Sequence, residues 1–238
     1  TSTSGNMTVT SDSDNGGTSS GALTMNDGTL INAGSGTISL AADEDIALGG
    51  LLTTNSSSTA MTITSSEGAI TDAGSTLVDI VAASGTVTID AATGVDIDTT
   101  VAILDLDNAT SGNIDINETD ALSINQIDQD GTGTVNVDAA GTITVVASQS
   151  GVTATSGNIE LDANGGSSDI VVNDGLLTTS GDISILADND ITFGADGDVT
   201  STSGNMTVTS DSDNGGTSSG ALTMNDGTLI NAGSGTIS

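Results

Sequence analysis

Short stretches in which apolar and polar residues alternate recur along the whole chain. Between residues 156 and 179, for example, the segments NIELDA, DIVVN and GLLTT carry aliphatic side chains at or near every second position, and glycine or polar residues separate them. Alternation over four to six residues predicts a β-strand with one buried face, and the separating residues are typical of turns. No stretch has the 3.6-residue apolar period of a helix, so the pattern predicts an all-β protein.

The alternating segments are grouped in a degenerate repeat of about 25 residues, in which we count three short strands. Three strands per repeat predict a parallel β-solenoid, because each coil then buries its inner face only by stacking on its neighbours. Each repeat opens with a small residue, usually followed by Gly, and then alternating aliphatics; the openings are at Ser4, Ser35, Ser58, Ser84, Ser111, Thr132, Ser156, Ser180 and Ser203.

The order of the strands predicts which apolar residues meet inside the solenoid. We expect the first strand of each repeat to stack on the first strand of the next repeat, and the second and third strands to do the same. In particular, Val87 and Ile89 should lie beneath Ile114 and Ile116. The third strand is less regular than the other two, and the segment VAILDLD from Val101 is assigned to it.

A second, much longer repeat contains the short one. Residues 1–39 and 200–238 are identical, at an offset of 199 residues, and eight short repeats fill that distance. We interpret residues 1–199 as one full solenoid unit of about eight coils and residues 200–238 as the start of the next identical unit, in one continuous elongated domain. On this interpretation the chain is a window on a longer tandem array. A single duplication is the alternative.

The composition excludes several classes of function. The chain has 32 acidic residues and no Lys, Arg, His or Cys. Binding to nucleic acid or to an anionic membrane surface depends on cationic side chains, so neither is expected as a partner. Carboxylate pairs such as Asp96/Asp98 are common, but the chain has no His, Lys, Arg, Tyr or Trp with which to hold a sugar or an acidic polymer beside them. We therefore expect no enzymatic activity, no catalytic residues and no organic cofactor.

The same charge predicts cations as partners. Residues 1–199 carry 29 of the acidic residues. Eight coils spaced by about 4.8 Å span about 38 Å, which gives one negative charge per about 1.3 Å of axis, compared with about 1.7 Å in duplex DNA. A layer of counterions is therefore expected around the rod.

Three groups of residues are candidates for specific cation sites. Ca²⁺ takes six to eight oxygen ligands, which suits an outward column or an acidic turn, and bound divalent ions would make the protein melt at a lower temperature in chelator. The alternative is that these residues are solvated turns and faces with diffuse ions, since Asp and Asn favour turns for backbone reasons. The candidates are the column Asp90, Asn117, Asp138 and Asp162, the turn with Asp12 and Asp14 and its copy with Asp211 and Asp213, and the turns with Asp43 and Asp45 and with Asp188 and Asp190.

The segments SGNIELDA, SGDISILADNDITF, SGTISLAADEDIALGG and GTVNVDAAGTITVVA resemble the repeat region of large secreted bacterial exoproteins of the filamentous-haemagglutinin type. The resemblance covers nearly the whole chain and is one of pattern. It implies a right-handed parallel β-helix, an extracellular or cell-surface location, and a role in adhesion or as a stalk or fibre. The absence of Lys and Arg and the long identical repeat depart from the family and favour a fibre over a receptor-binding tip.

We therefore expect a non-enzymatic structural module of a long extracellular filament or surface stalk. Its partners would be further copies of itself, joined in tandem, laterally or end to end, and cations. The alternative is an adhesin repeat, dependent on Ca²⁺ or not, that binds a glycan or a protein on another cell. An insertion that departs from the repeat would favour this alternative, but the only long insertion, residues 11–20, is small and polar.

Overall fold

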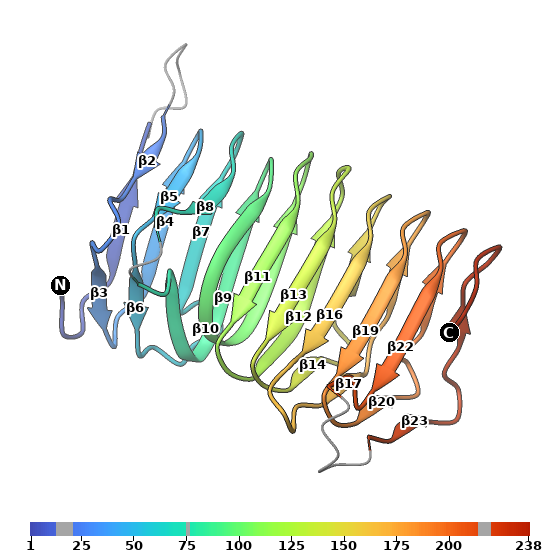
Figure 1. The fold of residues 1–238 in the computed structure, drawn as a ribbon. Coiled ribbons are helices and arrows are strands. Elements are labelled where there is room, and N and C mark those ends of the chain that lie inside the picture. Colours follow the sequence, from blue (N-terminus) through green and yellow to red (C-terminus); the bar gives the residue numbers. More distant parts are fainter. Residues whose placement is uncertain (13–20, 75–76, 214–219) are drawn as a thin grey trace.

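The computed structural model describes residues 1–12, 21–74, 77–213 and 220–238, and these form a parallel β-solenoid of about eight turns (Figure 1). Within those ranges every strand pairing is parallel and there is no helix, so none that could cross a membrane. The coils follow one another in sequence order, and the termini lie at opposite ends of the stack. The predicted all-β parallel solenoid is confirmed.

Most strands are two to five residues long, and three of them run on around corners. The strands are β1 (Met7–Thr10), β2 (Leu23–Thr24), β3 (Ile31–Gly34), β4 (Ile38–Ala42), β5 (Ile46–Leu48), β6 (Leu51–Thr53), β7 (Met61–Ser65), β8 (Ile70–Asp72), β9 (Ile80–Ala91), β10 (Val95–Asn108), β11 (Ile114–Glu118), β12 (Leu122–Gln129), β13 (Val135–Ala139), β14 (Ile143–Val145), β15 (Gly151–Ala154), β16 (Ile159–Ala163), β17 (Ile170–Val172), β18 (Leu176–Thr178), β19 (Ile183–Ala187), β20 (Ile191–Phe193), β21 (Val199–Ser201), β22 (Met206–Ser210), β23 (Leu222–Met224) and β24 (Ile230–Asn231).

The stacked strands make three faces, which we call A, B and C in the order in which the chain visits them. Face A contains β1, β4, β7, the ends of β9, β10 and β12, and then β15, β18, β21 and β24. Face B contains β2, β5, β8, the start of β10, and then β11, β13, β16, β19 and β22. Face C contains β3, β6, the start of β9, the middle of β10, the start of β12, and then β14, β17, β20 and β23.

The inside of the solenoid is a continuous column of aliphatic side chains. Inward residues such as Ile63, Ile116 and Leu161 are fully buried, and each touches the equivalent residues one coil above and below. Burying one such side chain stabilises the fold by about 1.5–3 kcal/mol. β-Branched residues suit this pleated surface. The only aromatic residue, Phe193, is also fully buried in the same column.

Buried polar side chains bridge consecutive coils at the corners. The Thr178 hydroxyl donates a hydrogen bond to the Gly157 carbonyl (2.8 Å) in the coil below and accepts one from the Gly181 amide (3.1 Å) in its own coil. Ser201 repeats this one coil later, with Gly181 and Gly204. Each corner thus ties two turns of backbone together by one hydroxyl that has no contact with water.

One coil is shorter than the others on face A, and the predicted stacking is wrong at that step. Leu104, and not Ile114, pairs with Val87 on face A, only 17 residues further along the chain. Ile114 pairs instead with Val95 on face B. Every later strand therefore lies one face further around the rod than the sequence pattern suggested. From the repeat that opens at Ser111 onward, the strands stack on one another as predicted.

The cause is β10, which passes through all three faces without a glycine break. Its inward alternation slips at Ala102 and Ile103, which are both only half-buried, and the register shifts beside them. A bulge of this kind lets a strand bend sharply. The segment VAILDLD therefore holds the end of one strand segment and the whole of the next, and the repeat that opens at Ser84 contains four segments instead of three.

Replacing Thr178 by Val tests the corner bridges. The change keeps the shape of the side chain but leaves the Gly157 carbonyl and the Gly181 amide buried without this partner. Leaving such groups unsatisfied costs about 1–3 kcal/mol, and we expect the free energy of unfolding in urea to fall by that amount. The neighbouring Thr179→Val, at an exposed position, is the control. Equal stability of the two variants would contradict the role of the bridge.

Candidate functional site: acidic columns and buried carboxyl groups

The outward side of face A carries three aspartates in register. Asp90, Asp107 and Asp128 lie directly above one another on β9, β10 and β12; we call them the Asp90 column. Like charges at a strand spacing of about 4.8 Å repel unless they are screened or bridged. Threonine hydroxyls close the column at both ends, since Thr64 donates to Asp90 (3.4 Å) and Thr153 donates to Asp128.

Burial and mutual repulsion both act on this column. Partial burial, and then the charges of Asp128, Asp130, Asp90 and Asp105, raise the pKa of Asp107 above its ordinary value. Uptake of protons or of counterions at this column is therefore favourable, because either lowers the repulsion.

Face B carries a second outward column, which contains one asparagine and three aspartates. Asp98, Asn117, Asp138 and Asp162 follow one another in register on β10, β11, β13 and β16. The Asn117 amide donates to Asp98 (3.2 Å), and the Asn164 amide donates to Asp138. Asp98 and Asp138 are therefore held by protein donors from neighbouring coils.

The predicted column of Asp90, Asn117, Asp138 and Asp162 is therefore correct for the last three residues and wrong for Asp90. Asp90 lies on face A, and its place beneath Asn117 is taken by Asp98. The short coil between Val87 and Leu104 is the reason, because it moves all later strands one face around the rod.

The other sequence candidates lie in turns at the corners. Asp12 and its copy Asp211 both adopt left-handed backbone conformations, with φ of 53° and 57°. Asp213 lies in the turn that follows Asp211, and Asp14 falls outside the described residues. Asp12 and Asp211, at equivalent positions of the two copies, thus share the same backbone conformation.

The remaining turn carboxylates bind backbone or hydroxyl donors of the adjacent coil. Asp43 accepts from the Ser66 hydroxyl (3.0 Å), and Asp45 accepts from the Ala69 amide (2.9 Å). Asp188 accepts from the Gly166 amide (2.8 Å) and the Ser212 hydroxyl (2.9 Å), and Asp190 accepts from the Ala221 amide (2.8 Å). These contacts give the four carboxylates a structural role in joining coils.

No group of three or more carboxylates suited to holding a metal ion is found within the described ranges of the chain.

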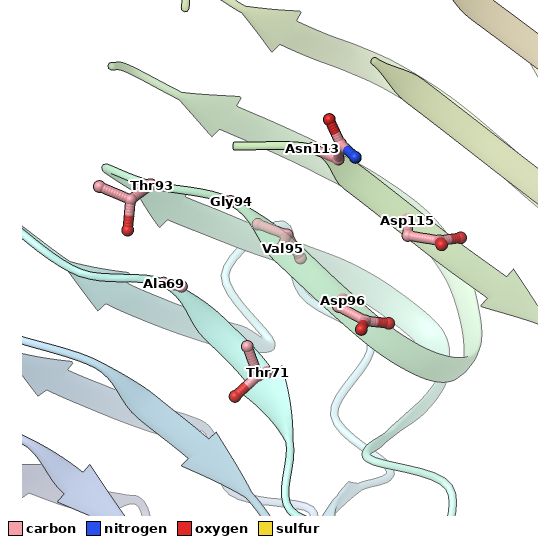
Figure 2. Close-up of a pocket in the computed structure, with 8 residues that line it drawn as sticks. All are labelled: Ala69, Thr71, Thr93, Gly94, Val95, Asp96, Asn113 and Asp115. Carbon is pink, nitrogen blue, oxygen red and sulfur yellow. The ribbon is translucent and has the colours of Figure 1, made fainter. Parts of the chain in front are cut away.

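A shallow pocket on face B shows how two carboxylates on neighbouring strands lie (Figure 2). Asp96 on β10 and Asp115 on β11 extend to the same side of the pocket, beside Thr71 and Asn113. Burial, followed by the charge of Asp115, raises the pKa of Asp96. Two carboxylates on neighbouring strands attract cations but do not form a cage around one.

Two buried carboxyl groups were not anticipated from the sequence. Asp79, just before β9, has an exposed fraction of 0%. Its Oδ2 accepts a hydrogen bond from the Asp98 amide (2.8 Å), whereas its Oδ1 has no hydrogen-bond partner. Burial raises the pKa of Asp79 from 3.8 to about 8, the Asp98 amide opposes the rise, and the nearby Asp72 charge adds to it. Asp79 is therefore mostly protonated at neutral pH.

Glu118 is the second buried carboxyl group, at the end of β11. It takes the inward position that follows Ile114 and Ile116, and this continuation of the alternation was the signal in the sequence that could have identified it. Burial raises its pKa from 4.5 to about 7. Hydrogen bonds from the Val101 amide (3.0 Å) and the Thr99 hydroxyl (2.9 Å) oppose the rise. No comparable sequence signal marks Asp79.

These two groups predict that the protein is more stable in mild acid than in mild base. Their pKa values are higher in the folded than in the unfolded chain, so the folded state binds more protons between about pH 4 and pH 8. Stability is then highest below pH 4 to 5 and falls as the pH rises, by about 1.4 kcal/mol per pH unit for each group within its window. We expect the melting temperature to fall between pH 5 and pH 8.

Asp79→Asn separates this effect from general charge repulsion. The amide keeps an oxygen for the Asp98 amide but has no proton to lose, so the melting temperature of the variant should depend less steeply on pH. Asp196→Asn, at an exposed position, removes the same formal charge and should keep the steep dependence. The same pH dependence in both variants would exclude Asp79 as the group responsible.

Screening by salt should stabilise the rod without a specific ion. The carboxylates form columns and do not form cages. We therefore expect the melting temperature to rise when NaCl is raised from 10 to 300 mM, because the Debye length shrinks from about 30 Å to about 6 Å, close to the spacing within a column. Chelator at fixed ionic strength should leave it unchanged. A drop in chelator would instead show a specific divalent site of the kind that the sequence suggested.

The chain matches no protein-family model, no curated protein and no solved structure. Its residues, its repeat and its fold are therefore the grounds on which a function can be argued.

Proposed function

We propose that this protein is a non-enzymatic structural module of a long extracellular filament or cell-surface stalk. The observation that carries the proposal is the identity of residues 1–39 and 200–238 together with their equal local structure. The 199-residue unit is followed by the first residues of an identical unit. Because a solenoid is extended by adding coils, tandem units of this kind can form a rod of any length.

Equivalent residues in the described parts of the two copies share several hydrogen bonds. Asn6 and Asn205 each accept from the amide 31 residues later, at Thr37 (3.0 Å) and Thr236 (3.2 Å). The backbone bond from Gly36 to Ala33 (3.0 Å) likewise recurs between Gly235 and Ala232 (2.8 Å). The segment thus folds in the same way with a coil above it or a coil below it.

Equivalent apolar residues of the two copies differ in their exposed fractions. Leu23 is 7% exposed beneath β5, whereas its copy Leu222 is 51% exposed. Met25 and its copy Met224 differ in the same way, at 8% and 47%. The strand that covers Leu23 comes from the residues that follow residue 39, so a further copy of the unit would cover Leu222 in the same way.

The chemistry of the rod suits a passive, stiff element. Backbone hydrogen bonds between coils run along the axis, and the aliphatic column inside is continuous. The outward charge keeps rods apart, or allows cations to bridge them. The extracellular location in this proposal rests on the resemblance to secreted exoproteins described above.

Electron microscopy of the native, full-length material tests the proposal. We expect unbranched filaments with an axial repeat of about 40 Å, because eight coils and one further strand at about 4.8 Å per coil give that length. A short rod that ends in a distinct domain would contradict the filament and point to a stalk that carries a binding function elsewhere.

A further inference from the structure

The two identical segments lie on different faces of the solenoid. Met7 in β1 is on face A, where it pairs with Ile38, whereas its copy Met206 in β22 is on face B, where it pairs with Ile183. Figure 1 shows β22 continuing the row of β11, β13, β16 and β19. The following strands shift in the same sense, since β2 is on face B and its copy β23 is on face C.

The change of face is not a local distortion of either copy. Equivalent turn residues keep their backbone conformation, as Gly34 and Gly233 show with φ of 59° and 55°. Both copies also keep the hydrogen bond from that glycine amide to the preceding Asn side chain, with Asn32 (2.8 Å) and Asn231 (2.9 Å). The whole coil is therefore carried around the axis as a unit.

The number of strands in the 199-residue unit explains the change. Eight successive pairings on face A lead from Met7 to Val199, and the next strand along the chain, β22, begins the second copy on face B. The unit is therefore eight coils and one strand long. The additional strand is the one that β10 contributes where it rounds its last corner, between Val101 and Leu106.

We infer that successive copies of the unit are rotated by one face about the rod axis, so that a tandem array repeats itself only after three copies. This inference rests on the proposed function in that it needs copies in tandem. The rotation is about one-third of a turn, to which the twist between successive coils adds. Each array therefore has three equivalent sides.

The rotation defines the surface that a neighbouring rod meets. The Asp90 column lies on face A in this copy, and it lies on face B in the next copy and on face C in the third. On any one face it recurs every three copies, or about 120 Å.

Pairs of introduced cysteines test the inference in the 238-residue chain itself. In-register neighbours on adjacent coils lie about 4.8 Å apart, within the range that a disulfide spans, and the natural chain has no cysteine. We expect Asp90→Cys with Asp107→Cys to oxidise to an intramolecular disulfide. Asp90→Cys with Asn117→Cys should remain reduced and open to alkylation, because these residues lie on different faces.

Two controls keep this test interpretable. Asn117→Cys with Asp138→Cys, in register on face B, should form a disulfide and shows that outward cysteines react when stacked. Circular dichroism should show the same strand signal for all three pairs, since every substituted residue faces outward. A disulfide between positions 90 and 117, with none between 90 and 107, would overturn the inference.

Helical reconstruction of the filament separates this inference from the proposed function. A rise of about 40 Å with a rotation of about 120° per unit would support both. A filament without this rotation would overturn the inference and leave the structural role standing. If no filament forms, the proposed function fails, and the cysteine pairs still decide whether the unit contains the additional strand.

Discussion

The stability of this protein depends on the contact of each coil with its neighbours, because no coil can bury its own apolar residues. Ile185, which has a coil on each side, is fully buried, whereas Leu222 in the last described coil is 51% exposed. The backbone hydrogen bonds between strands also depend on neighbouring coils, because all of the described strand pairings join one coil to the next. Each coil is thus both the cover of the coil before it and a template for the coil after it.

This constraint decides where charge can be placed. The inward positions must be apolar or paired, so nearly all acidic residues are outward or in turns, where stacking aligns them into columns. The chain lowers the repulsion in these columns by interleaving donors from adjacent coils, such as Asn117 beside Asp98 and Thr153 beside Asp128. Where a carboxyl group is buried, as in Asp79, a raised pKa keeps it neutral at the expense of stability at higher pH.

The same constraint makes the corners important. At a corner with glycine, a buried hydroxyl such as that of Thr178 joins the backbone of one coil to the backbone of the coil below. β10 turns its corners by a bulge instead, and one coil is shortened to 17 residues on face A. That single local feature changes the face on which every later residue lies, including the second copy of the repeat.

The strands, their inward residues, the acidic surface and the long repeat could all be predicted from the sequence, because each shows as alternation, composition or identity along the chain. The same reasoning put Asn117, Asp138 and Asp162 in one column. The three-dimensional fold was needed to show that Asp90 belongs to another column, that Asp79 is buried, and that the unit is one strand longer than eight coils. The place of Asp90 and the additional strand depend on how the backbone turns at Ala102 and Ile103, where two half-buried residues in succession shift the alternation. Such a bend is set by pairing with the coils on either side, and no residue type within the segment marks it.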